Sequence, residues 1–183
     1  MSAPPGCREL DFELEVAVVV GTEVADLEPD RWLDVVAGFC VMNDWSARDL
    51  QRREMRQGLG PAKGKDFALS LGPLLVTPDE LPDVETGRPR AEMVARVDGR
   101  ERSRGQLADI HHRWGDLLAH AARGTRLRPG DVVGSGTVGT GCILELALTH
   151  GSEAEPWLAP GDLVELEVEG LGCLANRVGA DDR

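Results

Sequence analysis

Apolar and polar residues alternate along several segments of the chain, and this pattern predicts strands. Residues 11–21, DFELEVAVVVG, form the clearest strand, because β-branched residues dominate the segment and Gly21 closes it. Residues 29–42 begin with helical spacing and pass into an apolar strand through Gly38. Further strands are predicted over residues 72–81, 130–148 and 161–174, with a hairpin over residues 92–101 whose tip is Asp98-Gly99.

Helical periodicity is confined to two longer segments. Residues 46–58 predict a helix with Ser46 as N-cap and Asp49 three residues later, a start similar to a capping box. Residues 107–123 predict an amphipathic helix with Gly124 as C-cap. The sequence contains no internal repeat and no convincing domain boundary. We therefore expect a single β-rich α+β domain over residues 1–183.

Composition and charge limit the kinds of binding partner and site to expect. Of the 183 residues, 42% are hydrophobic and 28% charged, which is ordinary for a globular domain with a real core. The net charge of −12 disfavours nucleic acid and anionic membranes as partners, because phosphate contacts need a basic surface. The sequence shows no secretory signal and no run of about 20 apolar residues, so we expect a cytoplasmic protein. Four scattered cysteines without a CxxC pair make zinc and disulfide sites weak candidates.

Two glutamates at the start of the first strand are candidate metal ligands. Residues two apart on a strand share a face, so Glu13 and Glu15 point the same way, and Ala17 and Val19 follow them there. An amphipathic strand with a solvated face is the alternative, and residues 162–170 illustrate it, because glutamates there fill one whole face. Two like charges on an apolar strand are costly unless a cation lies between them. A hard divalent cation with oxygen ligands fits that requirement.

Asp44 stands where the apolar segment ends and the next helix begins. This junction could aim a third carboxylate at the same ion, and a local turn or capping role is the alternative. On the helix behind it, Arg48, Gln51 and Met55 share one face. Arg48 and Gln51 would suit a carboxylate or carbonyl ligand, unless that face is ordinary helix surface.

Three further features carry candidate chemistry. The glycine-rich stretch 134–141 could offer backbone N–H groups to an anion, although tight hairpins have similar sequences. Glu145 lies in the apolar segment 142–148, where we expect it to be buried in a strand as an acid/base group or in a salt bridge. Lys63 and Lys65, which share one loop, are the only lysines of the chain. Its four histidines show no pattern that favours catalysis.

The motifs, taken in order, resemble the fumarylacetoacetate hydrolase family. The resemblance rests on DFELEVAVVVG, NDWSARDLQ, GPAKGKDFALSLGPLLVTPDEL, RGTRLRPGDVVGSGTVGTGCILEL and PGDLVELEVEGLGCLANRV, and runs from about Pro4 to Val178. It implies a mixed β-roll, usually dimeric. It also implies an enzyme that cleaves or rearranges oxo acids, such as acylpyruvates, at a divalent cation, with Mg²⁺ expected first and Ca²⁺ or Mn²⁺ as alternatives.

The resemblance also assigns roles to individual residues. It implies that Glu13, Glu15 and Asp44 hold the metal, and that Lys65 stabilises an enolate-like leaving group. Gln51 and Thr137 match positions that contact substrate, with Gly136 beside Thr137, and Glu145 matches a glutamate that orients a catalytic histidine.

Two positions depart from the family pattern, and two residues that the family carries are expected to be absent. Met55 stands where some members have a tyrosine, and Leu69 replaces a hydroxyl residue. Family members carry a further ligand aspartate and a general-base histidine upstream of the paired glutamates, and we expect neither here because the sequence begins a dozen residues before Glu13.

Two hypotheses about function follow. The first is a homodimeric metal-dependent enzyme acting on a 1,3-dicarbonyl or 2-oxo acid by C–C hydrolysis, decarboxylation, isomerisation or cyclisation through an enolate. The second is a degenerate binding or scaffold protein, or one half of a two-chain enzyme.

Overall fold

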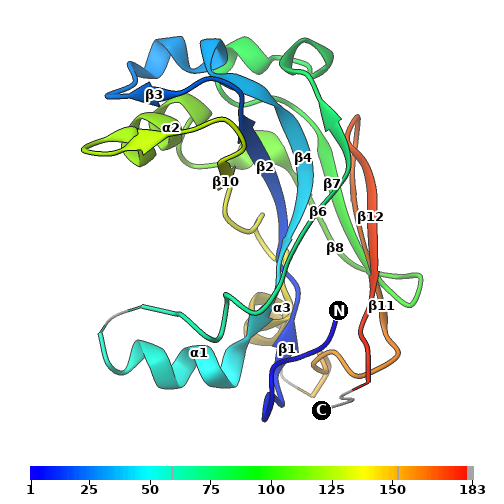
Figure 1. Ribbon diagram of the computed structural model, residues 1–183. Helices are drawn as coiled ribbons and strands as arrows, with labels where there is room; N and C mark the ends of the chain where they lie inside the picture. The colour runs from blue at the N-terminus through cyan, green and yellow to red at the C-terminus, as the bar shows by residue number, and fades with distance from the viewer. Residues whose placement is uncertain (59, 152, 181–183) are drawn as a thin grey trace.

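Two four-stranded antiparallel sheets face each other across the main core in the computed structural model, which describes residues 1–58, 60–151 and 153–180 (Figure 1). The strands of these sheets are β2 (Leu14–Val20), β4 (Val36–Asp44), β6 (Leu69–Val76), β7 (Glu92–Val97), β8 (Arg100–Gln106), β10 (Val132–Gly134), β11 (Leu163–Val168) and β12 (Gly172–Arg177). The first sheet has the order β10-β2-β4-β6, and the second has the order β12-β11-β7-β8.

Short elements close the ends of the sheets. Strand β1 (Leu10–Asp11) pairs with β5 (Ser46–Ala47), and β3 (Val24–Ala25) pairs with β9 (Arg126–Leu127). The α-helices are α1 (Arg48–Met55), α2 (Trp114–Ala122) and α3 (Ile143–His150), and single 3-10 turns cover Pro29–Asp34, Pro78–Glu80, Val84–Thr86 and Leu107–Asp109. The described helices are all too short to span a bilayer. Many strands with few helices confirm the predicted α+β class.

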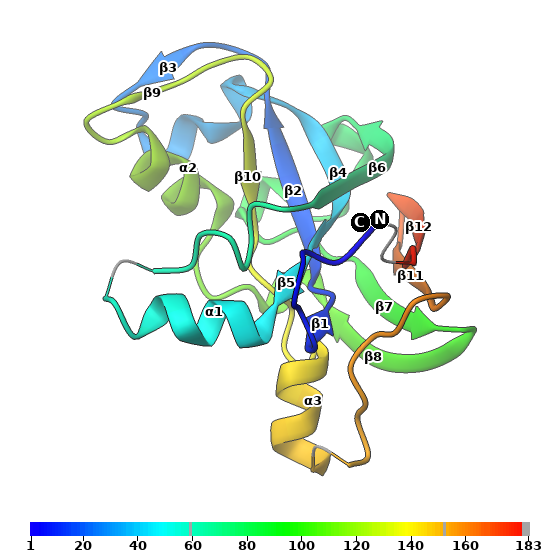
Figure 2. The same cartoon turned by 60° about the horizontal axis from the view of Figure 1, so that its bottom comes forward.

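Alternation along β2 decides which side chains enter the core. Leu14, Val16 and Val18 are fully buried between the two sheets, as their spacing predicts. Glu15 and Ala17 point to the opposite face of the first sheet, where a small second cluster of Ala17, Cys40 and Met42 lies. This outer face positions the candidate site. Figure 2 shows that α1, β1 and the start of β2 come together at one end of it.

The segment 142–148 is not the predicted strand but the first part of helix α3. Its unbroken apolar run hides the helical period: Ile143 and Leu146, three apart, are buried, whereas Leu148 is 81% exposed. The side chain of Asp11, distant in sequence, accepts hydrogen bonds from the first N–H groups of this helix. A partner so far away in the chain could not be predicted from the local pattern.

The predicted capping box of the first helix is wrong. Ser46 belongs to β5, opposite Asp11, and its hydroxyl donates to the carbonyl of Asp44. The helix begins at Arg48, and the Asp49 carboxylate accepts a hydrogen bond from the backbone of Arg8. Pairing with the N-terminal segment therefore moves the N-cap by one residue, from Ser46 to Ala47.

Of the remaining predicted strands and helices, some are confirmed and others differ from the structure. The hairpin with its tip at Asp98-Gly99 is confirmed as β7 and β8. The strand predicted over residues 161–174 is also found, as β11 and β12, which pair with each other. The predicted helix 107–123 begins only at Trp114, after a 3-10 turn. The predicted buried strand 72–81 is the edge strand β6, with Leu69, Leu71, Leu74 and Leu75 all exposed.

Candidate metal centre

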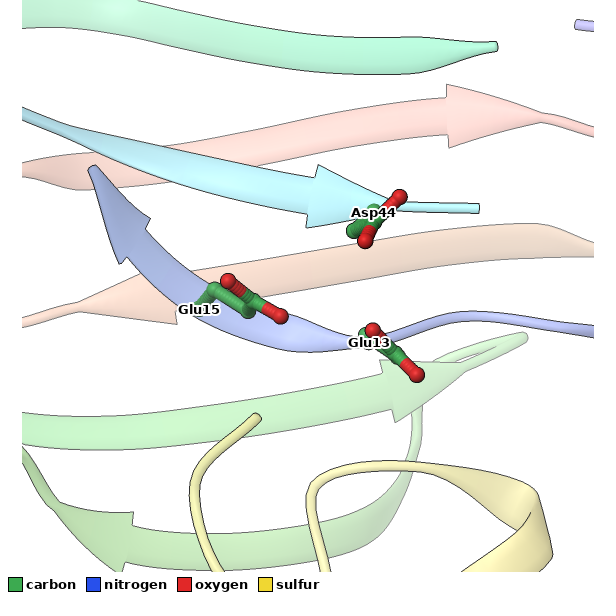
Figure 3. A group of neighbouring side chains, drawn as sticks. All are labelled: Glu13, Glu15 and Asp44. Carbon is green, nitrogen blue, oxygen red and sulfur yellow. The ribbon is translucent and has the colours of Figure 1, made fainter. Parts of the chain in front are cut away.

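Three carboxylates converge on the outer face of the first sheet. Glu13 immediately precedes β2, Glu15 lies within it, and Asp44 ends the neighbouring strand β4. Leu14 pairs with Asn43, and this antiparallel register brings Asp44 beside Glu13. One oxygen from each carboxylate lies within 4.8 Å of the others (Figure 3). We call Glu13, Glu15 and Asp44 the carboxylate cluster.

The two glutamates of the cluster are largely withdrawn from water. Glu13 is 8% exposed and Glu15 is 4% exposed. Burial, followed by the nearby charges of Glu13 and Asp44, raises the pKa of Glu15 to about 8. Burial alone would raise the pKa of Glu13 too, but the charges of Lys65 and Arg48 outweigh it and hold that pKa below its ordinary value. The cluster is thus a site where negative charge is costly and only partly compensated.

Lys65 supplies part of that compensation. Its ammonium lies 2.6 Å from Oε2 of Glu13 and 2.9 Å from Oδ2 of Asp44. Lys63, by contrast, is exposed and pairs with Asp66 away from the cluster. Of the two lysines in this loop, only Lys65 contacts the predicted ligands.

The loop that carries Lys65 is fastened to helix α1. The Glu54 carboxylate accepts hydrogen bonds from the backbone N–H groups of Ala62, Lys63 and Gly64, at 2.8, 2.8 and 3.1 Å. A side chain at position 64 would lie 2.8 Å from the backbone nitrogen of Gln51, so this close approach requires glycine. Helix and loop therefore present Lys65 as one unit.

Arg48 occupies a different place from the one expected. The side chain is buried, with Nε 2.8 Å from Oδ2 of Asp11 and Nη2 2.9 Å from Oε1 of Glu13. Its Nη1 donates to Oε1 of Gln51 at 3.1 Å. The guanidinium is engaged with protein groups, and its predicted contact with substrate stays a prediction. Gln51 is half-buried beside it, and its substrate role stays a prediction.

The glycine-rich loop lies against the cluster. The backbone N–H of Gly136 donates to Oε2 of Glu15 at 3.1 Å. A Cβ at Gly134 would approach the same oxygen to 2.7 Å, so only glycine fits there. Gly136 and Thr137 also line a cavity of about 300 Å³, together with Gln106, Asp109, His111 and others. The backbone donor of Gly136 thus serves a carboxylate of the protein, and the predicted substrate contact of Thr137 stays a prediction.

Glu145 is not buried in a strand as expected. It lies in the first turn of α3, half-buried, and its Oε2 accepts a hydrogen bond from the backbone N–H of Thr140 at 2.6 Å. Its backbone carbonyl accepts from the Thr149 hydroxyl. Among the described residues, no histidine is bonded to Glu145, and its predicted role in orienting one stays a prediction.

Asp11 is the residue that the sequence analysis missed. It is fully buried, and it accepts hydrogen bonds from Arg48 and from the backbone of Ile143 and Leu144. A signal was present, because Asp11 continues the two-residue spacing of Glu13 and Glu15 backwards. Asp11, Glu13 and Glu15 form a run of three acids at alternate positions.

Comparison with known proteins decides the family. The family model for the fumarylacetoacetate (FAA) hydrolase C-terminal domain matches residues 1–179. The chain belongs to the fumarylacetoacetate hydrolase family. A Burkholderia lata relative with a general hydrolase description is 36% identical over 173 residues, which are 92% of this chain and 56% of that protein. The chain thus spans about half the length of the curated relatives it matches.

Solved structures of family members share the fold. The 5-carboxymethyl-2-hydroxymuconate delta-isomerase of Mycobacterium smegmatis is 29% identical, with a TM-score of 0.80 over 100% of this chain and 64% of that one. The fumarylpyruvate hydrolase of Pseudomonas aeruginosa, solved with Mn²⁺ and pyruvate, is 26% identical, with a TM-score of 0.79 over 99% of this chain and 70% of that one. The family therefore includes both hydrolases and isomerases, and at least one member holds a divalent cation.

Proposed function

We propose that this chain is a divalent-metal-dependent enzyme of its family, acting on a 1,3-dicarbonyl compound or a 2-oxo acid. The observation that carries the proposal is the carboxylate cluster, with three oxygens from Glu13, Glu15 and Asp44 within 4.8 Å of one another. The complex of the similar Pseudomonas hydrolase with Mn²⁺ and pyruvate supports both the cation and the oxo-acid class. Mg²⁺, Mn²⁺ and Ca²⁺ all suit three carboxylate oxygens.

The charge around the cluster supports a doubly charged ion. Lys65 and Arg48 both form ion pairs with Glu13, and they also pair with Asp44 and Asp11 respectively. Glu15, the third carboxylate of the cluster, lies beside them and accepts a hydrogen bond from the backbone of Gly136. With every group ionised, this partly buried set carries two negative charges more than positive ones. Uncompensated charge away from water is expensive, and a divalent cation would balance it. The donor set therefore fits the group that the family implies.

The residues divide the proposed work between them. Glu13, Glu15 and Asp44 would hold the cation, which supplies Lewis-acid polarisation of a substrate carbonyl when bound. Lys65 places its ammonium beside the same carboxylates, where it would stabilise negative charge that develops on a substrate oxygen. The backbone N–H of Gly136 already donates a hydrogen bond to Glu15. Within the glycine-rich loop, we therefore assign the substrate contact to Thr137.

One observation favours a second candidate function. Among the described residues, the side chains that bond to the cluster carboxylates are those of Lys65 and Arg48, and neither is a suitable base for activating water at neutral pH. Hydrolysis needs such a base, whereas decarboxylation or tautomerisation asks less of the site. The alternative is a binding protein, or one half of an enzyme completed by a second chain.

The decisive experiment measures metal binding and turnover together. Titration calorimetry with Mn²⁺ on the chelator-treated protein should show one site, and a panel of 2,4-dioxo and 2-oxo acids should show metal-dependent loss of enol absorbance. The Asp44→Ala variant should lose both, whereas Asp66→Ala, which removes an exposed lysine-paired aspartate nearby, should keep both. Full turnover by Asp44→Ala would refute the metal mechanism. Mn²⁺ binding with no turnover across the panel would favour the second candidate.

A further inference from the structure

We propose that Asp11 is a positioning residue for the metal site, because through Arg48 it fixes the carboxylate of Glu13. The proposal rests on the proposed metal binding, and it concerns a residue outside the carboxylate cluster. Asp11 is fully buried and belongs to β1, which pairs with the segment that leads into helix α1.

The Asp11 carboxylate accepts three hydrogen bonds. Its Oδ1 accepts from the backbone N–H of Ile143 at 2.7 Å, and its Oδ2 accepts from Leu144 at 3.1 Å and from Nε of Arg48 at 2.8 Å. Three donors around two oxygens favour the ionised carboxylate, and they act against the burial that raises the pKa of Asp11. The first turn of α3 favours that negative charge, because its free N–H groups and the helix dipole both point at it.

The other side of the Arg48 guanidinium faces the cluster. Its Nη2 lies 2.9 Å from Oε1 of Glu13, while the Lys65 ammonium lies 2.6 Å from Oε2 of the same carboxylate. Both oxygens of Glu13 thus lie within ion-pair distance of a cation, and the Arg48 contact is a charge contact that is not aligned as a hydrogen bond. A planar guanidinium can bridge two carboxylates in one fixed geometry. Asp11 sets where that guanidinium lies, and hence how the Glu13 carboxylate is turned.

Without Asp11, two consequences follow for the metal. The buried Arg48 would keep only Glu13 as a charged partner, so its positive charge would compete with a cation for that carboxylate. The orientation of Glu13 would also lose its support. Residues that orient a metal ligand without touching the metal typically contribute about 10- to 100-fold to metal affinity.

The test is the Mn²⁺ affinity of Asp11→Asn, measured by calorimetry on the chelator-treated protein. The amide has nearly the same shape as the carboxylate but no negative charge to hold the guanidinium. Its NH₂ group would also face one donor in place of Oδ1, or two donors in place of Oδ2, so at least one hydrogen bond is lost in either orientation. We expect Mn²⁺ to bind at least 10-fold more weakly. Glu9→Gln is the matched control, because Glu9 also joins the N-terminal segment to α1, by pairing with Arg52, but has no contact with the cluster. Its Mn²⁺ affinity should equal that of the unmodified protein.

The outcomes separate this inference from the proposed function. No Mn²⁺ binding by the unmodified protein would overturn the proposed function and this inference with it. Binding by the unmodified protein, with unchanged affinity in a folded but less heat-stable Asp11→Asn variant, would overturn this inference alone and leave Asp11 as a helix cap. Arg48→Lys decides the matter if Asp11→Asn does not fold. It keeps a positive charge, but an ammonium cannot bridge both carboxylates, so the same 10-fold loss is expected and an unchanged affinity would overturn the inference.

Discussion

Two strands of this molecule carry the same Glu-x-Glu spacing, and they do different things with it. At the start of β2, Glu13 and Glu15 are nearly buried and meet Asp44 from the next strand. On β11, Glu165 and Glu167 lie on a face open to water, and Glu167 pairs with Arg96 of β7. The spacing alone therefore says only that two carboxylates share a face.

The neighbours on that face decide the outcome. After Glu15 the face continues with Ala17, which packs on Cys40 and Met42, so water is excluded along it. After Glu167 the face continues with Glu169, which stays exposed. A carboxylate pair on a dry face needs a cation, whereas a pair on a wet face is solvated at almost no cost. The same motif is a candidate metal site in one place and ordinary surface in the other.

Removing one carboxylate from each strand is the strongest way to break this comparison. Glu15→Gln should weaken Mn²⁺ binding by about 100-fold or more, because loss of a ligand should exceed the ~10- to 100-fold effect of losing a group behind one. Glu167→Gln should leave Mn²⁺ affinity unchanged, since it removes only an exposed ion pair. Calorimetry on both variants at pH 8 measures the difference. Equal affinities in the two variants would mean that β2 has no metal role.

The sequence predicted strands where β-branched residues dominate or where one face meets water. The pattern was clear in β2, which is rich in valine and buried on both faces, and in β11, whose outer face meets water, and both strands are confirmed. It failed where an apolar run had no period. The run at 142–148 is helix α3, fixed by Asp11, and the apolar edge strand β6 leaves four leucines exposed. In both places the answer depends on a partner from a distant part of the chain.

The candidate site also has parts that the local sequence pattern predicted and parts that depend on distant partners. The convergence of Glu13, Glu15 and Asp44 was predicted, because strand alternation and a strand end fix where carboxylates point. The position of Arg48 was not, because helical periodicity defines a face but not what covers it. Asp11 covers it here, from a strand that pairs only two residues with β5. The candidate ligands could be predicted from the local pattern, but the contacts that position them could not.

A comparison of the two lysines sharpens the assignment of Lys65. Lys65→Met should retain Mn²⁺ but lower the rate on an active oxo-acid substrate by about 100-fold, the scale for losing one group that stabilises a developing oxyanion. Lys63→Met should leave the rate unchanged, because that ammonium is exposed and bonded to Asp66. Steady-state rates at saturating Mn²⁺ measure both. A normal rate in Lys65→Met would make the ammonium a structural counter-charge.

The dependence of metal binding on pH provides the finest distinction between the dry and wet faces. Because burial and two neighbouring charges raise the pKa of Glu15 to about 8, the metal-free protein binds a proton there at neutral pH. A cation must displace that proton, so Mn²⁺ affinity should rise with pH, by roughly 10-fold per unit below pH 8, and then level off. The sign follows from the raised pKa, since a lowered pKa would give an affinity that is flat from pH 6 upward. Calorimetry between pH 6 and 9, in buffers of different ionisation enthalpy, counts the proton released. An affinity independent of pH over this range would mean that Glu15 is ionised without a metal, and therefore that its face of β2 is as well solvated as that of β11.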